Sequence, residues 1–478
     1  MGRARNEPAF MLFNSLEFGV FLTLVLALYF AIPAPLDRVR KGLLLVASYV
    51  FYGSWNPYFL LLLLGSTVLD YNVGRWMAAA SSASGRRALL ILSLAGNLGV
   101  LGFFKYGGFV LDQIHALEGL LLAAPQPAPQ WDFLLPVGIS FYTFQTLSYS
   151  IDVYRGQQKV CRSFLDFALF VSFFPQLVAG PIVRSKEFLP QLESRRTVRP
   201  SAVEMAMVRI GLGLFKKVVL ADTLGEYADT VFGDPGSFGT PNVLLAIYGY
   251  AYQIYFDFSG YSDIAIGLAA LFGFHIPENF DRPYLSTNPR EFWQRWHISL
   301  SSWLRDYLYV PLGGNRRGTV RTYVNLAVTM LLGGLWHGAS WNFVVWGAIH
   351  GTWSAAHRFF SRGRPAPEDR PVVRIAKQVA TFHMVCFAWV FFRAPDFATA
   401  GKIFDRLLVW QINIHSTATL AVLVLMLSVA LHIAESPLPL RERYRRLPAV
   451  VQGAGYAAIL ITVFLFSAGS ARFIYFQF

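Results

Sequence analysis

Runs of about 20 mostly apolar residues recur along this chain, and they constrain the fold more than any other feature. A helix that crosses a bilayer needs about 20 such residues. Only 14% of the 478 residues are charged, whereas soluble domains contain about 25%. The sequence therefore predicts an all-α, polytopic membrane protein with about ten to twelve transmembrane helices. The expected spans are residues 15–34, 42–55, 57–77, 88–108, 133–152, 203–224, 243–275, 322–335 continuing into 341–357, 378–394, 418–434 and 449–468.

The connections between these runs predict which side of the membrane each one faces. Lys and Arg are enriched in cytoplasmic loops. The connections 109–135 and 225–243 contain neither residue, so we place them outside, and we place the arginine-rich connections inside. Alternation of the spans then puts the N-terminus outside.

The apolar run 164–178 breaks this alternation. It lies between two basic connections, 155–162 and 184–199, that both belong on the cytoplasmic side. Pro175 and Pro181 would interrupt a helix at the C-terminal end of this run. Irregular backbone at membrane depth is tolerated only against protein or a water-filled cavity. We therefore predict a re-entrant or interfacial segment here.

The composition also bounds the partners. The net charge of +13 does not indicate nucleic-acid binding, because the basic residues are scattered through loops that face the cytoplasm and membrane lipids. Two cysteines, Cys161 and Cys386, do not make a disulfide framework. We find no soluble domain and no low-complexity linker, and we expect residues 1–478 to form a single membrane domain.

The block 282–351 is unusual because His, Arg, Trp and Gly concentrate there between apolar segments. Residues 282–321 contain seven arginines and no lysine, so this part belongs at the cytoplasmic face. His297 lies in it, whereas His337 lies in the apolar segment that follows and is expected to be deeper. Ionisable groups at membrane depth cost about 2.5–3.5 kcal/mol on insertion scales, so they usually mark a function.

His337 is the first candidate for chemistry. A neutral imidazole takes a proton from a hydroxyl and returns it to a leaving group, which suits acyl transfer. The alternative is a structural histidine bonded between helices. His297 either orients a substrate, acts as a second base or is structural. Two histidines without a third ligand do not indicate catalytic zinc, so we expect no metal. The chain also lacks the Gly-x-Ser-x-Gly elbow of serine acyl-enzymes.

Charged residues around the histidines have more than one interpretation. Asp257 and Asp263 either pair with arginines of the block, orient an imidazole, or neutralise charge inside the helix bundle. Arginines either bind the phosphates of a coenzyme-type donor or hold the loops on the cytoplasmic side and contact anionic lipids. The arginines concerned are Arg290, Arg295, Arg305, Arg316 and Arg317.

Several stretches carry a family resemblance in combination. They are 142–149, 173–181, 256–263, Trp296-His297-Ile298-Ser299-Leu300-Ser301 with 303–314, and Leu335-Trp336-His337-Gly338. Together they resemble the membrane-bound O-acyltransferase (MBOAT) family, in particular its bacterial branch that contains the membrane subunit of alginate O-acetylation.

The resemblance implies many helices around a tunnel that crosses the membrane. The acyl donor would approach from the cytoplasm and the acceptor from the other side. It also implies that His337 is the catalytic histidine and His297 the second active-site position. The residues that we assign to substrate binding are Trp296, Trp336, Asp257, Arg305 and Asp306.

The resemblance further implies an O-acyltransferase of the cell inner membrane, in which the outside N-terminus expected from the charge pattern would be periplasmic. It would move acetyl groups for O-acetylation of an alginate-like exopolysaccharide or a cell-wall polymer. The expected donor is acetyl-CoA or an acyl carrier protein, without a tightly bound cofactor. The expected partner is a periplasmic SGNH-type acetyltransferase or another polysaccharide-modification protein. The alternatives are a D-alanyl-transfer-type member of the family and a non-enzymatic transporter or channel.

Overall fold

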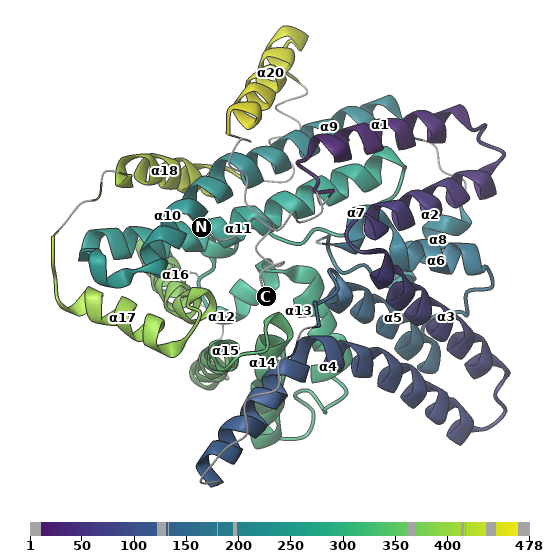
Figure 1. The fold of residues 1–478 in the computed structure, drawn as a ribbon, viewed down its shortest axis with the longest axis horizontal. Helices are drawn as coiled ribbons and strands as arrows, with labels where there is room; N and C mark the ends of the chain where they lie inside the picture. The colour runs from purple at the N-terminus through teal and green to yellow at the C-terminus, as the bar shows by residue number, and fades with distance from the viewer. Residues whose placement is uncertain are drawn as a thin grey trace. The chain divides into compact units, whose positions relative to one another are not determined.

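The computed structural model describes residues 11–121, 131, 133–178, 180–194, 198–361, 370–412, 415, 417–435 and 446–466. Helices and irregular connections make up these residues, and no β-strand occurs among them. The prediction of an all-α fold is therefore confirmed. Contacts within the chain define two compact units, shown in Figure 1. Unit 1 comprises residues 1–203 with 265–277, and unit 2 comprises residues 204–264 with 278–478. That the whole chain forms a single domain stays a prediction.

Unit 1 is a bundle in which short polar caps start several apolar helices. The side chain of Asn56 accepts a hydrogen bond from the Tyr58 amide at 2.9 Å, next to Pro57 in the first turn. Both residue types favour a helix start at these positions. Unit 1 contains α1 (Leu16–Ala31), α2 (Asp37–Gly53), α3 (Pro57–Ala79), α4 (Ala83–Leu121), α5 (Ile139–Tyr154), α6 (Phe164–Ser172), α7 (Phe174–Leu177) and α8 (Ser185–Glu193).

The run 164–178 is a broken helix, as its proline predicted. α6 ends before Phe173, and the single turn α7 starts with Pro175 in its first positions. The freed backbone is satisfied inside the unit. The amide of Phe174 donates to Ser48 Oγ at 3.1 Å, and the side chain of Gln176 donates to the Phe170 carbonyl at 2.7 Å. Irregular backbone surrounded by protein meets the condition for such a segment inside a membrane.

Unit 2 carries the polar block. It contains most of α9 (Pro200–Leu214) and of α11 (Thr240–Leu271), the π-helices η1 (Phe215–Ala221) and η4 (Arg305–Tyr309), and the 3₁₀ turns η2 (Pro235–Ser237) and η3 (Pro283–Leu285). The remaining helices are α10 (Asp222–Gly233), α12 (Pro289–Arg295), α13 (Ile298–Leu304), α14 (Thr319–His337), α15 (Trp341–Ser361), α16 (Pro371–Arg393), α17 (Phe397–Leu408), α18 (Ala418–Ala434) and α20 (Ala449–Phe466).

Glycines bring α14 and α15 into close contact. A Cβ added to Gly334 would lie 2.2 Å from the backbone oxygen of Phe343, and one added to Gly347 would lie 2.5 Å from that of Met330. Only glycine permits this approach, as at many helix interfaces in membranes. The contact fixes the end of α14, where His337 is the last residue.

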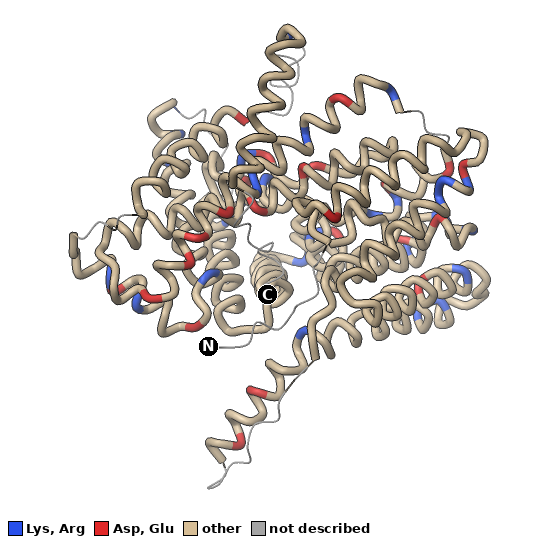
Figure 2. Tube along the Cα trace, turned by 45° about the horizontal axis from the view of Figure 1, so that its top comes forward, with Lys and Arg blue, Asp and Glu red and all other residues tan. Residues whose placement is uncertain are grey.

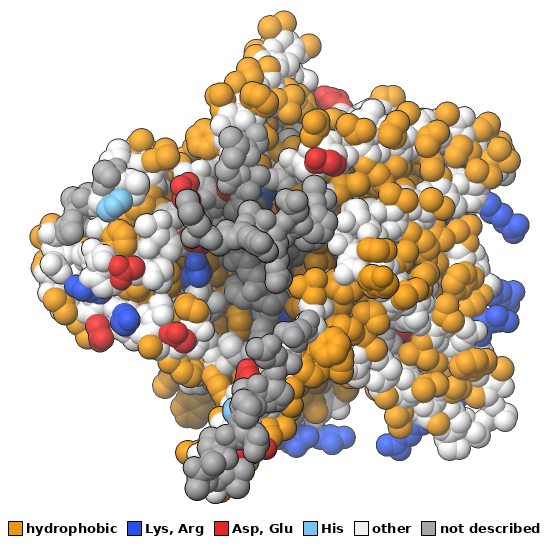
Figure 3. All heavy atoms as spheres, in the orientation of Figure 1, with side chains coloured by type: hydrophobic (Ala, Val, Ile, Leu, Met, Phe, Trp, Pro, Cys, Tyr) orange, Lys and Arg blue, Asp and Glu red, His pale blue; other side chains and the backbone are white. Residues whose placement is uncertain are grey.

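The exposed surface of several helices is apolar. On α1 the exposed side chains of Leu16, Val20, Leu24 and Leu28 recur every four residues and form one stripe. Figure 3 shows apolar side chains over the visible face of the unit 1 helices. In Figure 2 many charged residues of unit 1 lie near helix ends, although α3 and α4 also carry charged residues between their ends. A surface of this kind suits lipid.

Length and composition identify three membrane-spanning candidates within the described ranges. They are α4, α16 and α20, and two shorter helices, α1 and α18, are also apolar. Each predicted span coincides with helical structure, but the expected number of ten to twelve transmembrane helices stays a prediction.

Candidate active site

His297 lies at a sharp junction between two short helices. α12 begins after the cap residue Asn288, whose side chain accepts a hydrogen bond from the Glu291 amide at 2.9 Å. α12 ends at Arg295, and α13 begins at Ile298. His297 adopts a φ of +42° in the left-handed region, which is uncommon for a residue with a side chain. Such a conformation persists only where the surroundings hold it, and it is frequent at functional sites.

The ring of His297 is completely buried. Its Nδ1 lies 3.2 Å from Oδ1 of Asn279 and 3.5 Å from Oγ of Ser299. The ring of Phe258 meets it edge-on, with 4.6 Å between centroids. Burial lowers the pKa of His297 to about 3, because the charged form loses its hydration. The imidazole is therefore neutral at pH 7.

His337 is also buried, in an aromatic cage at the end of α14. Its ring contacts Trp336, Trp346 and Phe392, with centroids 5.0, 5.1 and 5.2 Å away. The next residue is Gly338, where an added Cβ would lie 2.0 Å from the ring of Phe343. The glycine in this motif is therefore explained by packing.

Trp336 connects the two predicted catalytic histidines. Its ring lies 5.9 Å from that of His297 and 5.0 Å from that of His337. The structure thus brings together three residues that the sequence assigned to the site. All three are buried and belong to unit 2.

Trp296 lies in the aromatic core beside the site. It is fully buried, stacks on Phe292 with 5.6 Å between centroids, and contacts Phe280 and Trp389 at 5.1 Å. These contacts describe a packing residue, and a role in substrate binding stays a prediction.

Asp257 is buried in an ion pair. Its carboxylate lies 2.6 Å from Nζ of Lys217, which also lies 2.7 Å from the carboxylate of Asp222. Asp263 pairs with Arg209 at 2.8 Å and with Lys216 at 2.7 Å. Of the interpretations drawn from the sequence, neutralisation of charge inside the bundle fits both aspartates, with cations from α9 and η1 as partners. Assignment of Asp257 to substrate binding stays a prediction.

Arg305 and Asp306 form a pair at the surface of η4. Their side chains meet at 2.7 Å, and that of Arg305 is 63% exposed. The neighbouring carboxylate of Asp306 raises the pKa of Arg305, since it stabilises the charged form. The pair lies on the accessible part of the block, and its role toward a substrate stays a prediction.

Sequence reasoning missed two further buried histidines, His432 on α18 and His350, which lies beside the site. The ring of His350, on α15, stacks on Phe292 at 5.9 Å and contacts Trp346 at 4.7 Å, and Trp346 in turn contacts His337. The available signal was an ionisable residue four positions after a tryptophan in an apolar run. No group of three or more His, Cys, Asp or Glu residues that could hold a metal ion occurs within the described part of the chain.

Comparison with known proteins places this geometry in a family. The model of the MBOAT, membrane-bound O-acyltransferase family, matches residues 158–394. The chain is 43% identical over 441 residues to the "Probable alginate O-acetylase AlgI" of Pseudomonas aeruginosa, covering 91% of this chain and 83% of that protein. It is 37% identical over 425 residues to the "Peptidoglycan O-acetyltransferase" of Helicobacter pylori, covering 83% and 78%. It is 28% identical over 295 residues to the "Teichoic acid D-alanyltransferase" of Bacillus subtilis, covering 58% and 73%.

Two buried histidines that both contact the indole of Trp336 therefore lie in a helical membrane acyltransferase. The chain belongs to the membrane-bound O-acyltransferase family. The resemblance predicted from the motifs is confirmed, and so is the prediction of an enzyme.

Proposed function

We propose that this protein moves acetyl groups from a cytoplasmic thioester donor across the inner membrane for O-acetylation of a polysaccharide. Acetylation is supported by the names of two relatives, one for alginate and one for peptidoglycan. The acceptor is thus an exopolysaccharide such as alginate or a cell-wall polymer, and the relative that is named for alginate has the higher identity.

The observation that carries the proposal is the pair His297 and His337 around Trp336. In the proposed step the acceptor oxygen attacks the thioester carbonyl, a C–O bond forms and the C–S bond breaks. His337 takes the hydroxyl proton and returns it to the departing thiolate, so that the imidazole is neutral at both ends of the step. His297 assists by orienting a substrate.

The donor side of the site is proposed to be the arginine-rich segment 282–321. Its seven arginines include Arg305, Arg316 and Arg317, which are exposed. Guanidinium groups match the phosphates of acetyl-CoA or of the phosphopantetheine arm of an acyl carrier protein. Arginine enrichment also favours a cytoplasmic location for this segment, with the N-terminus then in the periplasm.

A membrane enzyme that delivers acetyl groups outward needs a protein that places them on the polymer. We propose a periplasmic SGNH-type acetyltransferase, or another polysaccharide-modification protein, as that partner. Co-purification from the native host tests this part independently of the chemistry.

The alternative within the family is D-alanyl transfer, for which the relative from Bacillus subtilis is named. Its identity is lower, and it covers a smaller share of this chain than the two acetyl-transfer relatives do. Purified protein offered acetyl-CoA, an acetylated carrier protein and a D-alanylated carrier protein distinguishes the donors by which thioester it consumes. A transporter without chemistry is disfavoured by membership in an acyltransferase family.

The test in cells is replacement of His337 by Ala, with polymer O-acetylation as the readout and protein level as a check. The matched control is His383→Ala, because His383 is an exposed histidine of α16 that bonds Tyr248 at 3.0 Å. We expect loss of acetylation in the first variant and normal acetylation in the second. Wild-type acetylation in a normally abundant His337→Ala variant would rule out the catalytic role.

A further inference from the structure

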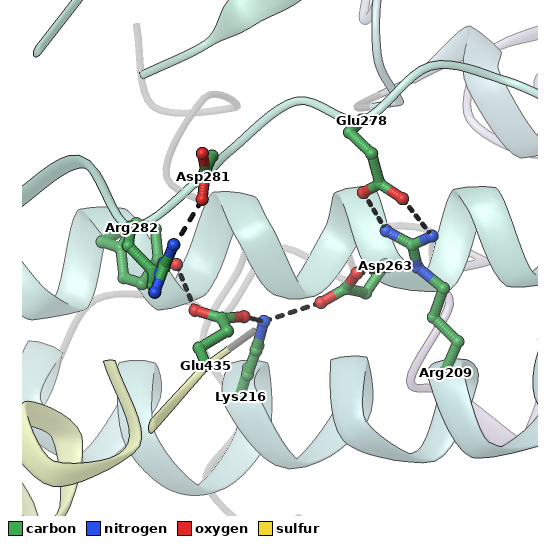
Figure 4. A network of polar contacts seen from close by, with 8 residues as sticks. Arg209, Lys216, Asp263, Glu278, Asp281, Arg282 and Glu435 are labelled. Carbon is green, nitrogen blue, oxygen red and sulfur yellow. Dashed lines mark hydrogen bonds and ion pairs between the residues drawn. The ribbon is translucent and has the colours of Figure 1, made fainter. Parts of the chain in front are cut away.

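The segment 278–282, which leads into η3, is irregular, and an ion pair anchors its start. Figure 4 shows the carboxylate of Glu278 facing the guanidinium of Arg209, whose NH1 donates to it at 2.7 Å and whose NH2 forms a second hydrogen bond. Further along, Arg282 has a φ of +46° and pairs with Asp281 at 3.3 Å. Just beyond, the amide of Tyr284 donates to Nε2 of His432 at 3.3 Å, so contacts with other helices hold the chain before and after Asn279.

This segment pairs with the junction that carries His297. The amide of Asp281 donates to the carbonyl of Arg295 at 3.0 Å, and the amide of Ile298 donates to the carbonyl of Asn279 at 2.9 Å. The two backbone hydrogen bonds lie on either side of His297 in the sequence. They account for the stability of its left-handed conformation, which has to be maintained by neighbours.

Asn279 adds side-chain contacts to this pairing. Its Oδ1 accepts hydrogen bonds from the amide of Ser299 at 3.2 Å and from Oγ of Ser299 at 2.8 Å, and it lies 3.2 Å from Nδ1 of His297. Its Nδ2 donates to Oγ of Ser262 on α11 at 3.3 Å. The backbone amide of Ser299 can only donate, so the oxygen of the Asn279 amide faces α13 and the nitrogen faces α11.

An amide oxygen only accepts hydrogen bonds, so Nδ1 of His297 has to carry a hydrogen. In a neutral imidazole the other nitrogen then holds the lone pair. We propose that Asn279 is a positioning residue of the acyltransferase, which fixes His297 as the Nδ1–H tautomer, so that Nε2 is the ring nitrogen with the lone pair when His297 orients a substrate. This inference rests on the proposed function, in which His297 orients a substrate.

The surroundings of His297 favour this neutral state. Phe258 from α11, Trp336 from α14, Ser299 from α13 and Asn279 contact its ring, and each of these four residues is uncharged. A substitution at Asn279 that introduces charge would place an ionised group at hydrogen-bond distance from the ring.

The first test compares Asn279→Ala and Asn279→Asp in the full-length protein, with acetyl-CoA as donor. Asn242→Ala is the matched control, because Asn242 is buried and accepts a hydrogen bond from Tyr227 at 2.9 Å in a different part of unit 2. We expect Asn279→Ala to lower kcat/KM by about 10- to 100-fold, the loss that follows removal of the partner that orients a metal-bound histidine. The control should lose stability without this loss of kcat/KM.

The Asn279→Asp variant separates positioning from packing. A carboxylate next to Nδ1 favours the imidazolium form and raises the pKa of His297. Because a charged ring cannot accept a hydrogen bond at Nε2, activity should fall on the acid side of the profile at a pH where the wild type is still active. A profile of wild-type shape in Asn279→Asp, or wild-type kcat/KM in a folded Asn279→Ala, would overturn the inference.

A second test does not depend on activity. Ring ¹⁵N spectra of histidine-labelled wild type and of His297→Gln identify the signals of His297 by difference. We expect a protonated Nδ1 and an unprotonated Nε2. The opposite tautomer would refute the inference even if acetyl transfer is confirmed, whereas a wild type inactive with every thioester would refute the proposed function instead.

Discussion

The indole of Trp336 lies 5.9 Å from the ring of His297, and His337 is the next residue in the same helix. Trp336→Ala would leave a cavity that lowers the unfolding free energy by about 3–5 kcal/mol. It would also remove the indole ring that both imidazoles contact. We predict a large loss of acetyl transfer together with lower thermal stability in detergent, and a milder loss of both for Trp336→Phe. Trp341→Phe, at an exposed tryptophan of α15, should change neither property. Equal activity of Trp336→Ala and wild type would contradict the contact's role.

Adjacent glycines of α14 provide a matched pair. A Cβ at Gly334 would lie 2.2 Å from a backbone oxygen of α15, which cannot move alone, whereas at Gly333 the nearest atom is Cδ1 of Leu304 at 3.3 Å. We predict that Gly334→Ala displaces the end of α14 with His337, and so lowers both stability and activity. Gly333→Ala should be tolerated. Assays of transfer and of thermal unfolding on both variants decide the matter, and indistinguishable variants would disprove the prediction.

The buried cation Lys217 faces two carboxylates, those of Asp257 and Asp222. Removing one partner of a buried ion pair costs about 3–5 kcal/mol, because the remaining charge is left without compensation. Lys217→Gln leaves two such carboxylates, but Asp257→Asn leaves Lys217 with one partner. We therefore predict a larger loss of unfolding free energy for Lys217→Gln, measured by chemical denaturation in detergent. The reverse order would show that Lys217 is not the centre of this cluster.

Acid should destabilise the fold partly through His297. Its pKa is about 3 in the folded protein and 6.5 in a model peptide, so between these values the unfolded chain binds one more proton. The contribution of the neutral His297 to the unfolding free energy is complete above pH 6.5. It is lost as the pH falls toward 3, by up to about 1.4 kcal/mol per pH unit. We predict that the unfolding free energy of His297→Gln falls less steeply with pH over this range. Parallel curves for the two proteins would mean that the pKa of His297 is not lowered.

Much of the fold follows from the sequence, because apolar runs and helix breakers act locally. The run 57–77 corresponds to α3 (Pro57–Ala79), and the interruption near Pro175 separates α6 from α7. The number of spans does not follow as directly. Several helices are shorter than 18 residues, and helices buried within a bundle need not be uniformly apolar, so only three pass a criterion of length and composition within the described chain.

The site was predictable only in part. His297 and His337 stood out as ionisable residues beside apolar segments, and the structure places both against Trp336. Asn279 carried no such signal, since asparagine is common in loops and its contact with His297 depends on how two irregular segments pair. The ion-pair partner of Asp257 could not be predicted either, because Lys217 comes from a separate helix that the tertiary structure brings against α11.

The central claim is that His337 performs the acyl transfer. Its most direct test is the rate of thiol release from acetyl-CoA, with a hydroxyl acceptor, by purified wild type, His337→Ala and His383→Ala at equal concentration. General acid–base catalysis typically contributes about 10²- to 10⁴-fold. We predict that His337→Ala loses activity by this factor while His383→Ala keeps the wild-type rate. A folded His337→Ala protein that releases thiol at the wild-type rate would contradict the account.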